Sequence, residues 1–430
     1  MELTPLQPWI ARKVGVDRLT RAALEAYQAA RLRETLAWAG TRSRFYRERL
    51  AGAPLPETLA DVAALPFTTA ADLCEDGLRF VCVSQGEIER VVTLDTSGTT
   101  GAAKRLYFTA ADQELTVDFF QVGMSTMCRA SAFTAPGDRV LILLPCARPG
   151  SVGELLARAL ARMGAEGIPH GPVRDVRVVL ELLARERVAG LVGIPAQVLA
   201  LARFPEQPPV ALQFALLTTD HVPHAIVSAV EQAWGCTVYN HYGMTEMGLG
   251  GGVECRARRG YHLREADLLF EIVDPSTGQP LPDGEEGEIV FTTLTRQGMP
   301  LIRYRTGDAG RFIPGPCPCG TVLRTLARVT RRLDNAVRLQ TGDLLTLAEL
   351  DEALFALEGV VDFAADFTPG DDLRLALAAH RSDAAPAARA AIMSLPAIAK
   401  AVADGALRLE ISVTPAGVPS PAKRTFNKKR

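Results

Sequence analysis

The chain has 430 residues, of which 48% are hydrophobic and 22% are charged, so it is long enough for two or three domains with ordinary globular cores. The 47 lysines and arginines nearly balance the 49 acidic residues, and a net charge of −2 argues against a nucleic-acid or membrane-surface partner. No apolar run approaches the roughly 18 residues of a membrane span, and residues 1–15 lack the apolar centre of a signal peptide. We therefore expect a soluble, cytoplasmic protein.

Helix patterns alternate with short buried strands through the first 240 residues. Apolar periodicity predicts helices over residues 17–50, 115–127, 153–163, 173–187 and 221–234. Runs of β-branched and other apolar residues predict strands over residues 91–94, 106–109, 139–144, 188–194, 214–219 and 236–239. Thr69 or Asp72 can cap a further short helix. This alternation is typical of an α/β domain with a mostly parallel sheet and helices on both faces.

The pattern changes after residue 268. Strands at residues 268–273 and 288–292 flank a long polar loop, which predicts an antiparallel hairpin. An arginine-rich segment near residues 328–335 then precedes a tail with two helix and three strand patterns, at residues 347–357, 360–367, 373–379, 384–393 and 407–413. We expect an α/β large domain with an added antiparallel β region over residues 1–330, and a small, mobile α+β domain over residues 331–430.

A Gly/Ser/Thr-rich loop at residues 96–104 joins the first two predicted strands. Its hydroxyls, glycines and lysine suit a loop that bends tightly around an anion, and these residues are Ser97, Gly98, Thr99, Thr100, Gly101 and Lys104. The spacing is not that of a nucleoside-triphosphate P-loop, and no helix pattern follows at once. The loop is a candidate phosphate cradle, and a polar turn without a ligand is the alternative.

Two more polar motifs follow strands further along the chain, one at residues 242–246 (Tyr-Gly-Met-Thr-Glu) and one at residues 303–308 (Arg-Tyr-Arg-Thr-Gly-Asp). With residues 44–50, residues 65–69 and the Ser-Gly-Thr-Thr-Gly loop, they occur in the order found in the adenylate-forming enzymes. The chain resembles that superfamily nearly end to end, and most closely its phenylacetate–CoA ligase branch.

The resemblance implies a two-step ligation. A carboxylate attacks the α-phosphate of ATP to give an acyl-adenylate and pyrophosphate, and CoA then displaces AMP. The loop and Lys104 would hold the phosphates while pyrophosphate leaves. Glu246 would bind Mg²⁺ through a hard carboxylate oxygen, and Thr245 would hydrogen-bond the α-phosphate. The substrates implied are a carboxylic acid such as an aryl-acetate, together with ATP and CoA.

The same resemblance places Tyr242 against the adenine and Asp308 on both ribose hydroxyls, and it makes Gly243 a nucleotide-binding residue. Asp220 lies where the family carries a glutamate beside the nucleotide. For Tyr242 the alternative is a packed core aromatic, for Asp308 a turn residue, and for Glu246 a surface carboxylate. Neither the identity of the acid nor the formation of a homodimer follows from the sequence.

The chain departs from the family at two places. At the domain junction, where the family has Gly-Arg-x-Asp-Asp, Arg332 and Asp334 are kept and Asn335 replaces the second aspartate, which leaves Asp334 as the expected hinge. The family ends in Ser-x-Gly-Lys-Ala-x-Arg, and we expect Pro421 at the place of the catalytic lysine. Lys423 would then be displaced by roughly 7 Å of extended chain.

This departure leaves three hypotheses in order. The first is an AMP-forming acid–CoA ligase in which Lys423 supplies the catalytic cation. The second is an adenylyl-transferring enzyme with a non-CoA acceptor, as in coenzyme F390 synthetases. The third is a nucleotide-binding pseudoenzyme.

Four metal-ligating side chains recur at short spacings. Cys255 and His262 form a Cys-x₆-His pair, and Cys317 and Cys319 form a Cys-x-Cys pair. In a cytoplasmic chain such cysteines favour a metal over a disulfide, and a Cys₃His set suits tetrahedral zinc. Some members of the resembled branch carry a similar set. We predict a structural zinc site here, and the alternative for the second pair is a proline-bracketed turn.

Overall fold

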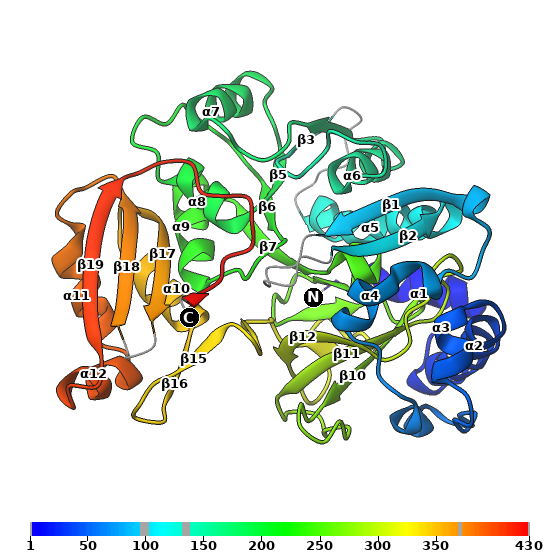
Figure 1. Cartoon of the computed structure of the whole chain (residues 1–430). Helices are drawn as coiled ribbons and strands as arrows, with labels where there is room; N and C mark the ends of the chain where they lie inside the picture. The colour runs from blue at the N-terminus through cyan, green and yellow to red at the C-terminus, as the bar shows by residue number, and fades with distance from the viewer. Residues whose placement is uncertain (1, 95–102, 131–137, 369–371, 429–430) are drawn as a thin grey trace. The chain divides into compact units, whose positions relative to one another are not determined.

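The computed structural model describes residues 2–94, 103–130, 138–368 and 372–428 (Figure 1). The chain forms two compact units, each of which is built from separate stretches of sequence. The first comprises Met1–Thr134, Arg148–Gly164 and His241–Val329, and the second comprises Ala135–Ala147, Ala165–Asn240 and Thr330–Arg430. The predicted division at residue 330 stays a prediction.

The first unit begins with helices that surround its antiparallel sheets. These are α1 (Leu6–Val14), α2 (Arg21–Arg42), α3 (Arg44–Arg49), α4 (Ala70–Asp76), α5 (Ala110–Ala130) and α6 (Val152–Ala161). The single helix expected over residues 17–50 is wrong, because Ser43 has extended backbone angles and separates α2 from α3. Its hydroxyl accepts a hydrogen bond from the Tyr46 amide at 3.2 Å, so Ser43 caps the second helix instead of continuing the first.

Helix α4 confirms the capping prediction. The Thr69 hydroxyl accepts from the Asp72 amide at 3.2 Å, and the Asp72 carboxylate accepts from the Thr69 amide at 2.7 Å. Both residues therefore act together in one capping box.

The sheets of the first unit are antiparallel. The strands are β1 (Ile88–Leu94), β2 (Lys104–Thr109), β8 (Gly252–Glu254), β9 (Tyr261–Leu263), β10 (Leu268–Val273), β11 (Gly287–Thr293), β12 (Tyr304–Gly310) and β13 (Thr325–Leu326). Strands β10 and β11 form the expected hairpin, with Phe270 opposite Phe291. Both phenylalanines belong to a hydrophobic core that also contains Tyr304. Buried apolar side chains therefore hold the start of β12 in place.

The second unit contains the parallel sheet that the strand pattern predicted. Its strands are β3 (Arg139–Ile142), β4 (Glu166–Pro169), β5 (Gly190–Gly193), β6 (Phe214–Leu217) and β7 (Thr237–Tyr242), in the order β7-β6-β5-β3-β4. Its helices here are α7 (Val176–Arg185), α8 (Pro195–Ala202) and α9 (His224–Trp234). The last two residues of β7, His241 and Tyr242, belong to the first unit, where they pair with β8.

The C-terminal part of the second unit is α+β, as expected. Its elements are β14 (Arg331–Arg332), β15 (Ala336–Arg338), β16 (Leu344–Thr346), α10 (Leu347–Phe355), β17 (Val360–Thr368), β18 (Asp372–Ala379), α11 (Ala384–Met393), α12 (Pro396–Ala403), β19 (Arg408–Pro415) and β20 (Asn427–Lys428). Strands β19, β18, β17 and β20 form one sheet in that order. Across all the residues described, no helix combines the length and the apolar character needed to cross a membrane.

Charged side chains join the two parts of the second unit. Arg203, just after α8, donates to the main-chain oxygens of Phe355 at 2.7 Å and Leu357 at 2.9 Å, at the C-terminal end of α10. The Glu352 carboxylate accepts from the His224 amide at 2.6 Å at the N-terminus of α9, whose N-cap residue is a proline. Each charge lies where the helix dipole stabilises it.

Candidate active site

Lys104 and Glu246, two of the residues that the sequence assigned to ATP and Mg²⁺, lie together in the first unit. Glu246 is in the single turn η4 (Thr245–Met247), which follows β7, and only 2% of it is exposed. The Lys104 ammonium, at the start of β2, forms an ion pair with Glu246 Oε1. The Tyr304 hydroxyl donates to the same oxygen at 3.2 Å and accepts from Lys104 Nζ at 3.4 Å. Glu246 is therefore not a surface carboxylate.

Arg296 holds the main chain of the same turn, and the sequence did not reveal it. Its Nη1 donates to the Glu246 carbonyl oxygen at 2.7 Å, and its guanidinium lies 4.3 Å from the centre of the Phe108 ring. Burial lowers the pKa of Arg296 to about 10, although Asp112 and Glu246 favour its charged form. Arg296 thus stays cationic at neutral pH. Its only signal in the sequence is a polar position between a buried strand and the Arg-Tyr-Arg-Thr-Gly-Asp motif.

Tyr242 and Asp308 form a second polar contact in this unit. The Tyr242 hydroxyl donates to Asp308 Oδ2 at 3.0 Å, and both side chains are buried. Burial and the negative charge of Asp308 raise the pKa of Tyr242 well above its usual range, so the hydroxyl stays a donor. The Tyr242 ring also lies near the Tyr261 ring, with centroids 5.8 Å apart. The structure therefore joins two residues that the sequence placed on opposite ends of adenosine.

Two glycines shape the main chain next to these residues, Gly243 after β7 and Gly307 within β12. A Cβ atom at Gly243 would lie 2.4 Å from the Leu249 carbonyl oxygen, which only glycine avoids. Gly307 has a φ of 74°, in the left-handed region, and its amide donates to Glu288 Oε1 at 3.0 Å. Thr245 is partly exposed at the start of η4. Gly243 is therefore required by close packing, in addition to any role beside a nucleotide.

The phosphate-cradle prediction falls on residues 95–102, which lie outside the described part of the chain. That range contains Ser97, Gly98, Thr99, Thr100 and Gly101. The ends of the loop are described, because Leu94 of β1 pairs with Lys104 of β2. The roles assigned to the five loop residues stay predictions.

Asp220, Arg332 and Lys423 belong to the second unit. Asp220 Oδ1 accepts from the His221 amide at 2.9 Å, and its Oδ2 accepts from the Arg424 amide at 3.0 Å. Arg332 Nε donates to Asp334 Oδ1 at 3.2 Å. The Lys423 side chain is exposed. The nucleotide roles of Asp220 and Arg332 stay predictions.

The expectation that Pro421 replaces the family lysine needs correction from the sequence itself. When Ser420 is aligned with the serine of Ser-x-Gly-Lys, Ala422 stands at the glycine and Lys423 at the lysine. The lysine is therefore not displaced, and the substitution in this motif is alanine for glycine.

The four predicted metal ligands meet in the first unit. Cys255, His262, Cys317 and Cys319 are all buried, and their ligand atoms lie within 4.8 Å of one another. The Cys255 and Cys317 sulfurs are 3.7 Å apart, and the Cys319 sulfur is 3.4 Å from His262 Nε2. The hydrogen bond from Cys255 and the nearby His262 lower the pKa of Cys319, and the same hydrogen bond raises the pKa of Cys255. Three sulfurs and one imidazole nitrogen form a set that fits a metal ion.

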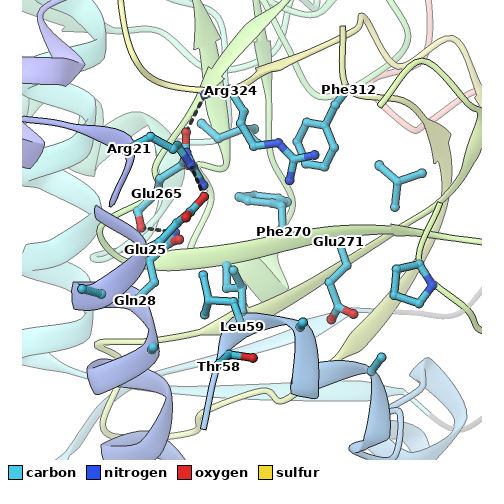
Figure 2. Close-up of a pocket in the computed structure, with 18 of the residues that line it drawn as sticks. Arg21, Glu25, Gln28, Thr58, Leu59, Glu265, Phe270, Glu271, Phe312 and Arg324 are labelled. Carbon is cyan, nitrogen blue, oxygen red and sulfur yellow. Dashed lines mark hydrogen bonds and ion pairs between the residues drawn. The ribbon is translucent and has the colours of Figure 1, made fainter. Parts of the chain in front are cut away.

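A cavity of about 620 Å³ lies elsewhere in the first unit, between α2 and β10 (Figure 2). Its charged side chains already pair: Arg21 binds Glu25 at 2.8 Å and also Glu265. Arg324 lies 3.3 Å from the centre of the Phe312 ring. None of the residues assigned to ATP, CoA or metal lines this cavity. The motif residues around Glu246 are therefore the better candidate for the active site.

Comparisons with known proteins identify the family of this chain. Residues 89–295 match the model of the AMP-binding enzyme family. The phenylacetate–coenzyme A ligase of Thermus thermophilus is 31% identical, over 80% of this chain and 78% of that protein. The enzyme of the same name from Aromatoleum evansii is 30% identical, over 76% of this chain and 75% of that protein.

Solved structures show the same fold. A 2-hydroxyisobutyryl-CoA ligase in the postadenylation state aligns with a TM-score of 0.77 and 20% identity, over 96% of this chain and 89% of that one. An anthranilate CoA ligase bound to anthranoyl-AMP aligns with a TM-score of 0.55 and 17% identity, over 81% and 68% of the two chains.

Fold and motifs together define an adenylate-forming enzyme. Within that class, the chain belongs to the phenylacetate–coenzyme A ligase family. It is thus an AMP-forming acid–CoA ligase, which uses ATP to activate a carboxylic acid as an acyl-adenylate and transfers the acyl group to CoA.

Proposed function

We propose that the acid is an aryl-acetate or a close analogue. The phenylacetate–coenzyme A ligases that are 31% and 30% identical to this chain support this substrate class. The observation that best supports adenylation is the buried cluster of Lys104, Glu246 and Tyr304. Arg296 stabilises this cluster by donating to the Glu246 carbonyl oxygen. The cluster combines one buried carboxylate, which can bind a metal ion, with several donors, which can bind phosphate oxygens.

Glu246 and Lys104 take the phosphate side in this proposal. Glu246 would hold Mg²⁺, because its carboxylate oxygen already accepts from a cation and from the Tyr304 hydroxyl. Bound Mg²⁺ would neutralise charge on the phosphates as pyrophosphate leaves. Lys104 would then be released from Glu246 to bind a phosphate oxygen. Thr245, next to Glu246 and partly exposed, would donate to the α-phosphate.

The adenosine side rests on Tyr242, Gly243 and Asp308. Asp308 would accept from the ribose hydroxyls, and the Tyr242 hydroxyl orients its carboxylate from 3.0 Å away. Gly243 lets the main chain after Tyr242 pass close to the Leu249 carbonyl, and its own main chain would lie beside the nucleotide. The cradle residues Ser97, Gly98, Thr99, Thr100 and Gly101 would bind the phosphates, and the nucleotide roles expected for Asp220 and Arg332 of the second unit stay predictions.

Zinc is the metal that we propose for the Cys₃His cluster. Four protein ligands close a tetrahedral site and leave no position for a substrate, so its role would be structural. Cys255 follows β8, His262 lies in β9, and Cys317 and Cys319 lie between β12 and β13. The metal would therefore tie the β8–β9 hairpin to the segment that follows Asp308.

Lys423 is the proposed catalytic cation of the adenylation step. A lysine on a small domain that turns about Asp334 can neutralise charge on the acid and α-phosphate, and can then leave before CoA enters. Because Lys423 stands at the place of the family lysine, a missing lysine no longer favours a pseudoenzyme. A non-CoA acceptor, as in coenzyme F390 synthetases, stays the alternative. A cytoplasmic location stays a prediction from the sequence, and formation of a homodimer stays open.

ATP–pyrophosphate exchange across a panel of carboxylic acids tests this function, with CoA added afterwards. We expect phenylacetate or a close analogue to give the fastest exchange and to yield a thioester when CoA is added. Exchange without a thioester would favour a different acceptor. No exchange with any acid would favour a nucleotide-binding pseudoenzyme.

A further inference from the structure

The segment around Lys423 is anchored at both ends within the second unit. On its N-terminal side, Gln197 Nε2 donates to the Pro419 carbonyl oxygen at 2.8 Å, and Gln197 is fully buried in α8. On its C-terminal side, the Arg424 amide donates to Asp220 Oδ2 at 3.0 Å. Residues 420–423 between these anchors are exposed. In Figure 1 this red segment lies between β19 and the end of the chain.

Asn335 adds a two-way contact just beyond Lys423. Its Nδ2 donates to the Arg424 carbonyl oxygen at 3.2 Å, and its Oδ1 accepts from the Phe426 amide at 2.9 Å. The side-chain amide therefore pairs with the main chain as a neighbouring strand would. A carboxylate at position 335 could accept from Phe426 but could not donate to Arg424.

The Arg424 side chain fixes the same residue from the other direction. Its guanidinium pairs with Asp351 of α10 and lies 3.5 Å from Asp362 of β17. It also lies 4.1 Å from the centre of the Phe363 ring. Arg424 is thus held through its amide, its carbonyl and its side chain, which leaves little freedom for the residue before it.

We propose that Asp220 and Asn335 are positioning residues that present Lys423 for adenylation by binding the main chain at Arg424. This proposal rests on the proposed catalytic role of Lys423. It gives Asp220 a task apart from nucleotide binding, since both of its oxygens accept main-chain amides. It also explains why the junction carries Asn335 where an aspartate was expected: the tail contact needs a donor and an acceptor on one side chain.

The test is a double-mutant cycle on the full-length chain with Asn335→Asp and Lys423→Ala. Adenylation is measured by pyrophosphate exchange, and thioester formation is measured separately from supplied acyl-adenylate. Asn335→Asp should slow exchange about 10-fold, which matches the loss of one hydrogen bond and a new repulsion at the Arg424 carbonyl. Thioester formation should stay within about twofold of wild type. In the Lys423→Ala background, the same change should have no further effect.

Asn427→Asp is the matched control, because Asn427 binds the Asp366 side chain at 2.7 Å and not the tail main chain near Lys423. It should leave exchange within about twofold of wild type. A 10-fold loss in this control would mean that any loosening of the tail slows adenylation, and it would overturn the specific role of Asn335.

Hydrogen exchange at the Arg424 and Phe426 amides provides a readout that needs no activity. The Arg424 amide should exchange at least about 10-fold faster in Asp220→Ala than in wild type, and the Phe426 amide should do so in Asn335→Ala, because each change removes the acceptor of that amide. Unchanged hydrogen exchange at these amides would overturn the proposal. Equal losses of pyrophosphate exchange on Asn335→Asp with and without Lys423 would overturn it as well. An inactive wild type with protected amides would instead refute the proposed function and the catalytic role of Lys423, and the positioning proposal would fall with that role.

Discussion

Lys104 and Glu246 lie 142 residues apart in the sequence and form an ion pair whose side chains are only 13% and 3% exposed. Neither charge is easily solvated there, so each depends on the other until a ligand replaces it. A site of this kind is prepared for an exchange of cations: a metal ion can take the carboxylate while the lysine takes a phosphate. The pair therefore links the first residue of β2 to the turn after β7 in one electrostatic unit.

Glu246→Gln should abolish Mg²⁺-dependent adenylation while the chain still folds, with a lower melting temperature because Lys104 loses its buried partner. The change removes the charge that would hold the metal, and we expect pyrophosphate exchange to fall on the order of 10²-fold or more. Exchange kinetics and a circular dichroism melt measure the two effects. Glu34→Gln, an exposed carboxylate on α2, is the control and should be silent. Wild-type exchange in Glu246→Gln would refute the assignment.

Arg296→Gln should weaken the same step, because Arg296 holds the Glu246 carbonyl and adds a buried positive charge beside it. We expect a loss of roughly 10-fold to 100-fold in exchange, and a higher Mg²⁺ concentration for half-maximal rate. A Mg²⁺ titration at saturating ATP is the measurement. Arg311→Gln, which alters an exposed arginine, is the control and should leave the Mg²⁺ requirement unchanged. An unaltered Mg²⁺ requirement would show that Arg296 only supports packing.

Cys319→Ser should remove the bound metal from the Cys₃His cluster. Wild-type protein purified without chelators should contain about one equivalent of zinc by mass spectrometry, and the variant should contain little. Its melting temperature should fall by several degrees, as expected for the loss of a stabilising site in a chain of this size. Cys74→Ser, outside the cluster, should keep the metal. Less than about half an equivalent of zinc in wild type would count against the site.

Lys423→Ala should slow adenylation by orders of magnitude and spare thioester formation from supplied acyl-adenylate. The cation is needed only while negative charge builds on the α-phosphate and the attacking carboxylate. Lys428→Ala, a change in the same basic tail, should alter neither step. Small and equal effects of the two substitutions would show that adenylation proceeds without a tail lysine.

His241 should make the folded state sensitive to acid. Its ring lies near Phe119 and Phe120, with centroids 6.2 and 6.3 Å away, and burial lowers the pKa of His241 to about 4. Because the unfolded histidine has a pKa near 6.5, the unfolded state alone takes up the proton between about pH 6.5 and pH 4. This contribution to stability is therefore present above pH 6.5 and is lost as the pH falls to 4.

Urea unfolding at several pH values measures this effect. The wild-type free energy of unfolding should lose up to about 3 kcal/mol more than that of His241→Gln over the window from pH 6.5 to pH 4. Parallel pH profiles for the two proteins would show that His241 is protonated in the folded state as readily as in the unfolded chain.

The parts of the fold that could be predicted are those where the local sequence pattern indicates capping or burial. The Thr69–Asp72 capping box marks the start of α4, and the buried runs of β3, β5 and β6 mark a parallel sheet. Helix α8 was missed because all of its residues are buried, so no polar face shows its period. Strand β4 was missed because glutamate, glycine and proline are poor strand formers, tolerated here at the edge of the sheet.

The site divides in the same way. The Cys₃His cluster was predictable, because thiols and imidazole at short spacings have few other uses in a chain of this kind. Asp220 and Arg424 are 204 residues apart, and no local sequence pattern indicates that they are in contact. Arg296 was missed for the same reason, since its partner is a main-chain carbonyl, which every residue carries.

Product analysis decides whether this protein is an AMP-forming acid–CoA ligase. Wild-type protein is mixed with phenylacetate, ATP, Mg²⁺ and CoA, and AMP, pyrophosphate and acyl-CoA are quantified over time by liquid chromatography and mass spectrometry. We expect equal amounts of the three products, with acyl-adenylate detected when CoA is left out. ADP and phosphate in place of AMP and pyrophosphate, or a thioester formed without an adenylate, would contradict this expectation.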